Sequence, residues 1–134
     1  MHEFFKPETQ SVRETFSGYK YYKVPDYQRP YSWEDEQIEQ LWDDIYSAFD
    51  GKDDVYFLGP AILAQTSDKY LEVVDGQQRL TTLTILFCVL RDIYLKDLDD
   101  NDALKRAISD AIRSMVENEY RLRLITQAHY QNQF

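Results

Sequence analysis

One stretch of the sequence decides the fold: Val73-Val74-Asp75-Gly76-Gln77-Gln78-Arg79-Leu80. The residues just before it, 70–74, are β-branched and aromatic types that predict a strand. Residues 77–95 are densely apolar and hold neither Gly nor Pro, which predicts a buried helix. A strand is therefore expected to turn directly into a helix at residues 75–79.

This turn permits two interpretations. A helix N-terminus offers unpaired backbone N–H groups and a partial positive charge, so phosphate could bind there, with Gly76 admitting a ligand and Arg79 gripping its oxygens. Alternatively, Asp75 is an N-cap and Gln78 completes a capping box, which the motif taken alone favours. The two interpretations conflict because a carboxylate repels phosphate. Nucleotide binding here therefore implies a divalent cation at Asp75, or Asp75 turned away from the phosphates.

Composition and charge narrow the class of protein. The chain has 134 residues, 43% hydrophobic and 15% aromatic, which predicts one folded domain over 1–134. No apolar run has the length of a membrane span and no signal peptide is visible. Together with the lone Cys88 this predicts a cytoplasmic protein with no membrane partner.

The net charge of −9 is unevenly distributed, since residues 34–54 contribute −8 of it. A helix this acidic is more often a solvated face than a partner site. No segment is basic enough for a duplex DNA footprint, so we expect DNA to be engaged only through the full-length protein.

The remaining patterns predict an α+β fold in which a small mixed sheet packs with helices and is followed by a C-terminal helix and a short strand. The core spans 19–96 and a helical extension spans 101–134. The expected strands are 19–24, 55–65 and 121–125, the last one half-exposed, with a hairpin turn at 66–69. The expected helices are 33–49, capped by Ser32, and 103–117. Their predicted inner faces consist of apolar residues at helical spacing: Ile38, Leu41, Trp42, Ile45 and Phe49 in the first, and Leu104, Ala107, Ile108, Ala111, Ile112 and Met115 in the second. The chain ends without a closing signal, so we expect an N-terminal fragment of a longer protein.

A second unusual stretch is Tyr27-Gln28-Arg29-Pro30-Tyr31-Ser32-Trp33. If it is extended, Tyr27, Arg29, Tyr31 and Trp33 share one face, where the rings could stack with Arg29 or flank a base. Taken alone, packing against the core is the favoured interpretation. The sequence has no P-loop, and His2 and His129 lie near opposite ends of the chain, so a P-loop nucleotidase, a His/Cys zinc site and a catalytic triad are not expected.

These two stretches together resemble one family, the N-terminal domain of GmrSD-type restriction proteins, first named domain of unknown function 262. The resemblance rests on motifs in the same order and separation: Val24-Pro25-Asp26-Tyr27-Gln28-Arg29-Pro30-Tyr31-Ser32-Trp33, Phe57-Leu58-Gly59 and Val74-Asp75-Gly76-Gln77-Gln78-Arg79-Leu80-Thr81-Thr82-Leu83. It covers 19–94 well and 121–134 more loosely.

The resemblance implies a fold similar to ParB and sulfiredoxin that binds a nucleoside triphosphate at the strand–turn–helix. It also implies hydrolysis coupled to DNA cleavage by an HNH nuclease domain or subunit elsewhere, in restriction or phage defence. An oligomer is possible, and the sequence does not decide the oligomeric state.

The resemblance also implies roles for individual residues. Backbone N–H groups of Gly76, Gln77 and Gln78 would cradle phosphates while Arg79 neutralises charge. Asp75 would orient water or hold Mg²⁺ or another divalent cation. The residues expected to be catalytic are Asp75, Gln78 and Arg79. The residues expected to bind the nucleotide are Gly76, Gln77, Tyr27, Gln28, Arg29 and Thr82.

A different class of function stays open beside this one. The domain could be a regulatory module that binds nucleotide or a protein partner without turnover and controls an attached effector. Residues 34–54 would then be its docking face.

Overall fold

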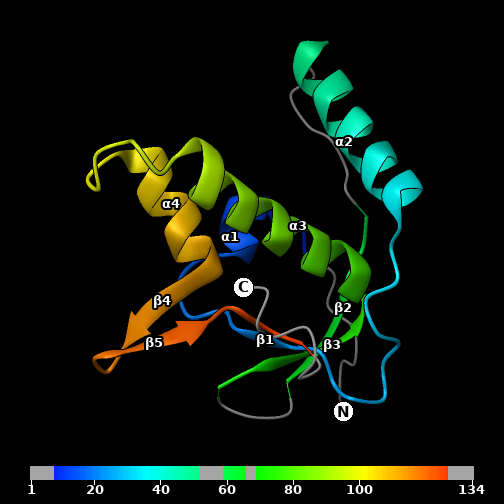
Figure 1. The fold of residues 1–134 in the computed structure, drawn as a ribbon. Coiled ribbons are helices and arrows are strands. Elements are labelled where there is room, and N and C mark those ends of the chain that lie inside the picture. The colour runs from blue at the N-terminus through cyan, green and yellow to red at the C-terminus, as the bar shows by residue number, and fades with distance from the viewer. Residues whose placement is uncertain (1–7, 52–58, 66–68, 127–134) are drawn as a thin grey trace.

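The computed structural model describes residues 8–51, 59–65 and 69–126 (Figure 1). Outside the described residues lie the 55–58 part of the strand predicted over 55–65, with its Phe57-Leu58 motif, the turn residues 66–68, His2 and His129. In the described part of that predicted strand, residues 62–65 are strand and residues 59–61 are not. The architecture is mixed α+β, as the sequence predicts. No helix in the described ranges is both long enough and apolar enough to cross a membrane.

The helices and strands follow one another along the chain in mixed order. The helices are α1 (Val12–Thr15), α2 (Asp35–Asp50), α3 (Gln77–Val89), which continues as the π-helical turn η1 (Leu90–Tyr94), and α4 (Ala103–Ile112). The strands are β1 (Tyr22–Lys23), β2 (Ile62–Gln65), β3 (Leu71–Asp75), β4 (Arg113–Val116), β5 (Glu119–Leu122) and β6 (Leu124–Ile125). The predicted strand at 70–74 and helix at 77–95 are confirmed, and the expected strand at 19–24 is shortened to β1.

The main sheet has the strand order β2-β3-β1-β6. β1 lies at its centre and runs parallel to both neighbours, with Tyr22 opposite Leu71 on β3 and Leu124 on β6. β2 pairs antiparallel with β3, which confirms the predicted hairpin. β4 and β5 form a separate hairpin whose turn places Glu117 and Asn118 at positive φ, as a tight two-residue hairpin turn requires.

The core lies where α3 meets the main sheet and α4. Its members are buried side chains from every part of the described chain: Phe16, Tyr22, Val24, Val73, Leu80, Leu83, Phe87, Cys88, Ala111, Ile112 and Leu124. Phe16 after α1 packs edge-on against Phe87 with ring centroids 5.1 Å apart, which fixes α1 to α3. Burial raises the pKa of the Cys88 thiol, so this cysteine is a protonated packing residue at neutral pH.

Arg123 is the most consequential departure from the sequence pattern. The alternation at 121–125 predicts a half-exposed strand, yet Arg123 is only 1% exposed, between β5 and β6. Its guanidinium donates to the carbonyl oxygens of Gly18 (3.1 Å), Lys20 (2.9 Å) and Asp110 (2.6 Å) and pairs with the Asp110 carboxylate at 3.0 Å. The planar fork of donors finds acceptors on every side, which makes burial of this charge tolerable.

The start of the predicted helix at 33–49 needs correction, whereas its end at Gly51 is as the sequence predicts. Ser32 does not cap it, because α2 begins at Asp35 with Glu34 as N-cap and Gln37 completing the capping box. The Ser32 N–H donates instead to Gln78. Gly51 does end α2, but in a right-handed conformation with φ of −75°.

The predicted inner face of α2 is also largely wrong. Leu41 is buried, but Ile38, Trp42 and Phe49 are 38%, 53% and 79% exposed. Figure 1 shows why: α2 stands apart from the sheet and from the other helices and projects away from them. Helical periodicity identifies residues that share a face, but it does not ensure that another element covers that face.

α4 ends earlier than its pattern predicts. The expected helix runs to 117, but α4 stops at Ile112 and Arg113 takes an extended conformation with φ of −154°. Met115 therefore lies on β4 with 57% exposure instead of on the inner face of a helix, and Leu104 at the start of α4 is likewise 57% exposed. The pairing of β4 with β5 replaces the last helical turn, and the chain then returns to the main sheet as β6.

Replacement of Arg123 tests its structural role. Arg123→Ala leaves the Gly18, Lys20 and Asp110 carbonyls without their donor, so we expect the free energy of unfolding to fall by at least about 3 kcal/mol. The matched variant Arg106→Ala removes an exposed arginine from α4 and should change it by less than about 0.5 kcal/mol. Urea denaturation of both variants measures the difference, and equal stabilities would contradict this role.

Candidate functional site

The first turn of α3 is the centre of the candidate site. Gly76 is its N-cap, in a left-handed conformation with φ of 94°, and among the described residues no side chain hydrogen-bonds to the turn as a cap. Asp75 instead ends β3, opposite Ile62 on β2, and is exposed. The capping box of Asp75 and Gln78 is therefore wrong. The first backbone N–H groups of α3 carry the positive end of the helix dipole, and no side chain of residues 8–51, 59–65 or 69–126 accepts from them.

Gly76 is required by the chain's own packing. A Cβ at this position would lie 3.0 Å from the Ala61 Cβ and 3.1 Å from the Ala61 Cα, on a backbone that side chains rarely adopt. One side of Gly76 is thus closed by the residue that leads into β2. A ligand at this turn would approach from the side of the N–H groups.

The segment at 27–33 is tied to this turn by several hydrogen bonds. Gln28 Nε2 donates to the Val74 carbonyl at 2.8 Å, and Gln77 Nε2 donates to Gln28 Oε1 at 3.4 Å. Residues 26–27 form a turn closed by the Gln28 N–H and the Pro25 carbonyl at 3.0 Å. The structure therefore brings together the two motifs that the sequence separates by more than forty residues.

Gln78 and Thr82 face the inside of this arrangement. Gln78 is 8% exposed; its Oε1 accepts from the Ser32 N–H at 2.9 Å and its Nε2 donates to the Pro30 carbonyl at 3.2 Å. The Thr82 hydroxyl donates to the Gln78 carbonyl at 2.8 Å. Because the Thr82 hydroxyl already donates its hydrogen to the Gln78 carbonyl, the Tyr31 hydroxyl is the donor in the 2.8 Å bond between the Tyr31 and Thr82 oxygens. These groups hold the 30–32 segment against α3.

The aromatic residues of that segment do not share one face. Tyr27 is 73% exposed, Tyr31 is bonded to Thr82, and Trp33 lines a cavity with Arg79. The prediction of a single extended face is wrong because the turn at 26–27 breaks the alternation. Arg29 is exposed beside this turn.

Arg79 points from the first turn of α3 toward Gly59 and α2. A Cβ at Gly59, where φ is 118°, would lie 2.5 Å from Arg79 Nη1, so only glycine leaves room for this guanidinium. Arg79 Nε is buried, and it has no hydrogen-bond partner in the part of the chain that the structure describes. The guanidinium is therefore closely packed against Gly59, and its Nε–H remains a donor without a partner among the described residues.

A cavity of about 370 Å³ lies beside Arg79, under the first half of α2. Its other walls are side chains of α2 and of Trp33, two residues before α2 begins: Trp33, Glu36, Gln37, Gln40, Leu41 and Asp44. Sequence reasoning treated the acids of this helix as a solvated face and missed them here. The available signal was the four-residue spacing of Glu36, Gln40 and Asp44, which places two acids and an amide on one helix face.

The site offers limited ligation for a metal ion. Among the described residues, no group of three or more His, Cys, Asp or Glu side chains is arranged to hold one. Mg²⁺ usually needs only one or two carboxylates when phosphates and water complete its shell. The exposed Asp75 beside the uncapped turn fits that requirement.

Comparison with known proteins supplies one match. The chain matches the family model described as GmrSD restriction endonuclease, N-terminal domain, over residues 12–133. A comparison with curated proteins finds no match. The family match spans both motifs of the candidate site and all of the helices and strands described above.

Substitution of Gly76 tests how closely the turn is packed. Gly76→Ala adds a Cβ against Ala61 and strains a left-handed backbone, so we expect about 2–3 kcal/mol less free energy of unfolding. Gly18→Ala is the matched control, because Gly18 has φ of 65° but nothing within 4 Å of its added Cβ; it should cost only about 1 kcal/mol. Thermal and urea unfolding compare the two, and equal costs would mean that Ala61 does not crowd the turn.

The role of Gln78 is tested against its neighbour. We expect Gln78→Ala to reduce the free energy of unfolding by about 1–2 kcal/mol and to speed hydrogen exchange at the Ser32 amide, which loses its acceptor. Gln77→Ala removes one long hydrogen bond at 3.4 Å and should leave the Ser32 amide protected. Unchanged Ser32 exchange in Gln78→Ala would show that this bond does not hold the segment.

Proposed function

We propose that this chain, which belongs to the family of GmrSD restriction endonuclease N-terminal domains, binds a nucleoside triphosphate at the start of α3. The family sets the context as restriction or defence against phage. The observation that carries the proposal is the first turn of α3, which follows left-handed Gly76 and has no side-chain cap from the described part of the chain. Unsatisfied N–H groups at a helix N-terminus are a common seat for phosphate.

The phosphates in this proposal lie against the N–H groups of Gly76, Gln77 and Gln78. The helix dipole favours negative charge there by about 0.3–1 kcal/mol at an exposed site, so additional cations are needed for tight binding. Arg79, with its unpartnered Nε, supplies one from within α3. Arg29 is exposed and supplies a second from the segment tied to the turn by Gln28.

Carboxylates near the site set a requirement for a divalent cation. Asp75 ends β3 beside the turn, and Glu36 and Asp44 line the cavity that Arg79 enters. Bound Mg²⁺ supplies charge that neutralises both the triphosphate and these acids. Asp75 is the residue that would hold it, and otherwise orients the attacking water.

Gln78 and Thr82 serve the site through position. Both side chains are buried and their polar atoms are engaged with residues 30–32 and with the backbone of α3. We assign them to holding the Tyr27–Arg29 segment beside the phosphates. A strand–turn–helix nucleotide site of this kind fits the ParB- and sulfiredoxin-like fold that we propose for the family.

Hydrolysis of the bound nucleotide would regulate DNA cleavage by an HNH nuclease domain or subunit outside this chain. One observation favours the alternative of a regulatory module without turnover. The Gln78 amide is fully committed to Pro30 and Ser32, which leaves Asp75 as the proposed group for orienting water. Binding and turnover are therefore tested separately.

Nucleotide binding is measured by titration calorimetry of each nucleoside triphosphate with Mg²⁺. We expect micromolar binding by the wild-type chain and a loss of at least tenfold in Arg79→Ala, because a charge-assisted contact to phosphate contributes about 1.5–3 kcal/mol. Lys69→Ala, an exposed residue before β3, is the control and should bind as the wild type does. Equal affinity in Arg79→Ala and the wild type would refute the proposed site.

Turnover is measured in the whole restriction protein with the nucleotide that binds. Asp75→Asn should keep binding within a few fold and reduce the hydrolysis rate by about 10²-fold or more if Asp75 orients water. Hydrolysis that is undetectable in the wild-type protein despite saturated binding would favour the regulatory module. Hydrolysis unaffected by Asp75→Asn would remove Asp75 from the mechanism.

A further inference from the structure

One face of α2 is apolar and open. Ile38, Trp42, Ile45 and Phe49 recur at intervals of four, three and four residues, which places them along one line of the helix. We refer to these four residues as the apolar stripe. Three of them are exposed and Ile45 is half-buried, and α2 projects away from the sheet and from the other helices (Figure 1). An exposed apolar face of this kind marks a surface that binds a partner.

The two sides of the apolar stripe differ in character. Leu41 and Ala48 each lie one position before a stripe residue and are buried, so that side of α2 is covered by the protein. Glu39, Asp43 and Asp50 each directly follow a stripe residue and are exposed. One position turns a helix by about 100°, so these three acids form an acidic ridge along the other side of the stripe. None of the three forms an ion pair with the described part of the chain.

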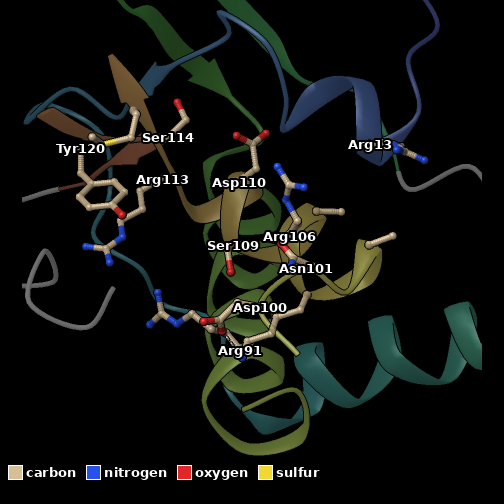
Figure 2. A pocket seen from close by; sticks show the side chains of 14 residues that line it. Arg13, Arg91, Asp100, Asn101, Arg106, Ser109, Asp110, Arg113, Ser114 and Tyr120 are labelled. Carbon is tan, nitrogen blue, oxygen red and sulfur yellow. Dashed lines mark hydrogen bonds and ion pairs between the residues drawn. The ribbon is translucent and has the colours of Figure 1, made fainter. Parts of the chain in front are cut away.

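The cavity of about 730 Å³ between α1, α4 and β4 offers no such apolar surface (Figure 2). Most of its lining is charged or polar. Lys105 and Asp100 of this lining already pair with each other at 3.0 Å, and the Asp110 carboxylate pairs with Arg123. A partner that buries apolar surface therefore finds it on α2 and not in this cavity.

We propose that the apolar stripe inserts into an apolar groove rimmed by lysine and arginine side chains, on another domain or subunit of the whole restriction protein. A helix that binds in a groove presents anchors at these spacings, and tryptophan is a frequent anchor. The acidic ridge requires the basic rim, because complementary charges favour docking in one orientation. The partner is placed in the restriction protein because the matched family is described as the N-terminal domain of a restriction endonuclease. The inference rests on that family context of the proposed function, and not on nucleotide binding.

Charge sets the other occupants aside. Residues 34–54 sum to −8, so this helix repels nucleic acid and anionic lipid headgroups. Helices that lie on membranes carry Lys and Arg on their polar face, whereas α2 has neither. A second copy of this chain also fits less well. Antiparallel pairing of two stripes would set one acidic ridge against the other, and parallel pairing would set it against the side of Leu41 and Ala48, which is already covered.

The test places a photo-crosslinking phenylalanine analogue at Phe49 in the whole restriction protein. Phe49 is 79% exposed, so the analogue projects from α2 without disturbing its packing. Mass spectrometry should identify crosslinks to an apolar segment that carries lysine or arginine and lies outside residues 1–134. The same analogue at Tyr19, which is 95% exposed and lies outside α2, should not reach that segment. Crosslinks confined to residues 1–134, in the same chain or in a second copy, would overturn the proposal, and so would the absence of crosslinks.

Reversal of charge tests the basic rim. Glu39→Lys/Asp43→Lys brings like charges to the rim, so the crosslink yield from position 49 should fall at least roughly fivefold. Asp97→Lys/Glu119→Lys makes the same change of charge at two exposed residues outside α2 and should leave the yield unchanged. Equal yields in the two double variants would mean that docking does not depend on the acidic ridge, and the proposal would fail.

Truncation of Trp42 tests the apolar stripe itself. Tryptophan anchors are frequent hot spots, so Trp42→Ala should reduce the crosslink yield roughly tenfold or more. Tyr94→Ala removes an exposed aromatic side chain from η1 and should leave the yield unchanged. An undiminished yield in Trp42→Ala would contradict the proposal.

Folding and nucleotide binding are measured on the same variants. Circular dichroism and thermal unfolding establish that each variant is folded. Glu39, Trp42, Asp43 and Phe49 do not line the cavity at Arg79, so the α2 variants should bind nucleoside triphosphate in calorimetry as the wild type does. The docking surface and the proposed nucleotide site can therefore fail independently.

Discussion

The rest of the structure depends on the burial of one charged side chain, Arg123. Its guanidinium joins the carbonyls of Gly18 and Lys20, which lead into β1, to Asp110 near the end of α4. This places β6 beside β1 and, through β1, fixes the parallel register of β3. β3 in turn delivers Asp75 and Gly76 to the start of α3. Burying this guanidinium costs desolvation free energy, which its hydrogen bonds to the surrounding carbonyls and to the half-exposed Asp110 carboxylate offset. The same bonds join segments from both ends of the described chain.

In the candidate site, too, several motif residues are fixed by contacts within the protein. Gly76 and Gly59 are glycines for steric reasons internal to the fold, since Ala61 closes on the first and the Arg79 guanidinium on the second. Both polar atoms of the Gln78 side chain form hydrogen bonds with the 30–32 segment. The motif residues thus divide into those that build the turn and those, Asp75, Arg79 and Arg29, whose side chains form no hydrogen bond or ion pair with the described residues. This division supports the proposed phosphate site, because the packed residues of the motif hold the turn that presents the other three.

Local sequence signals predicted the elements that depend on local physics. The strand before Asp75 and the apolar helix after Gly76 are confirmed because β-branched runs and long apolar stretches without Gly or Pro favour those states wherever they lie. Predictions failed where a partner segment decides the outcome. α4 ends at Ile112, earlier than predicted, because β4 pairs with β5. The alternation at 121–125 predicted a half-exposed strand, but Arg123 is buried because its hydrogen-bond acceptors come from residues far away in the sequence. The Asp75 capping box failed because the left-handed Gly76 takes the N-cap position.

The sequence by itself determined the family, the strand–turn–helix and the residues placed on it, because each is written in consecutive positions. Only the tertiary structure decided what those residues meet. It brought Gln28 to Gln77, turned Arg79 toward α2 and left the apolar face of α2 exposed. It also placed Glu36 and Asp44 beside Arg79, which no segment sum of charge reveals. The physical reason is that charge and burial act through space, and positions far apart in sequence become neighbours only when the chain folds.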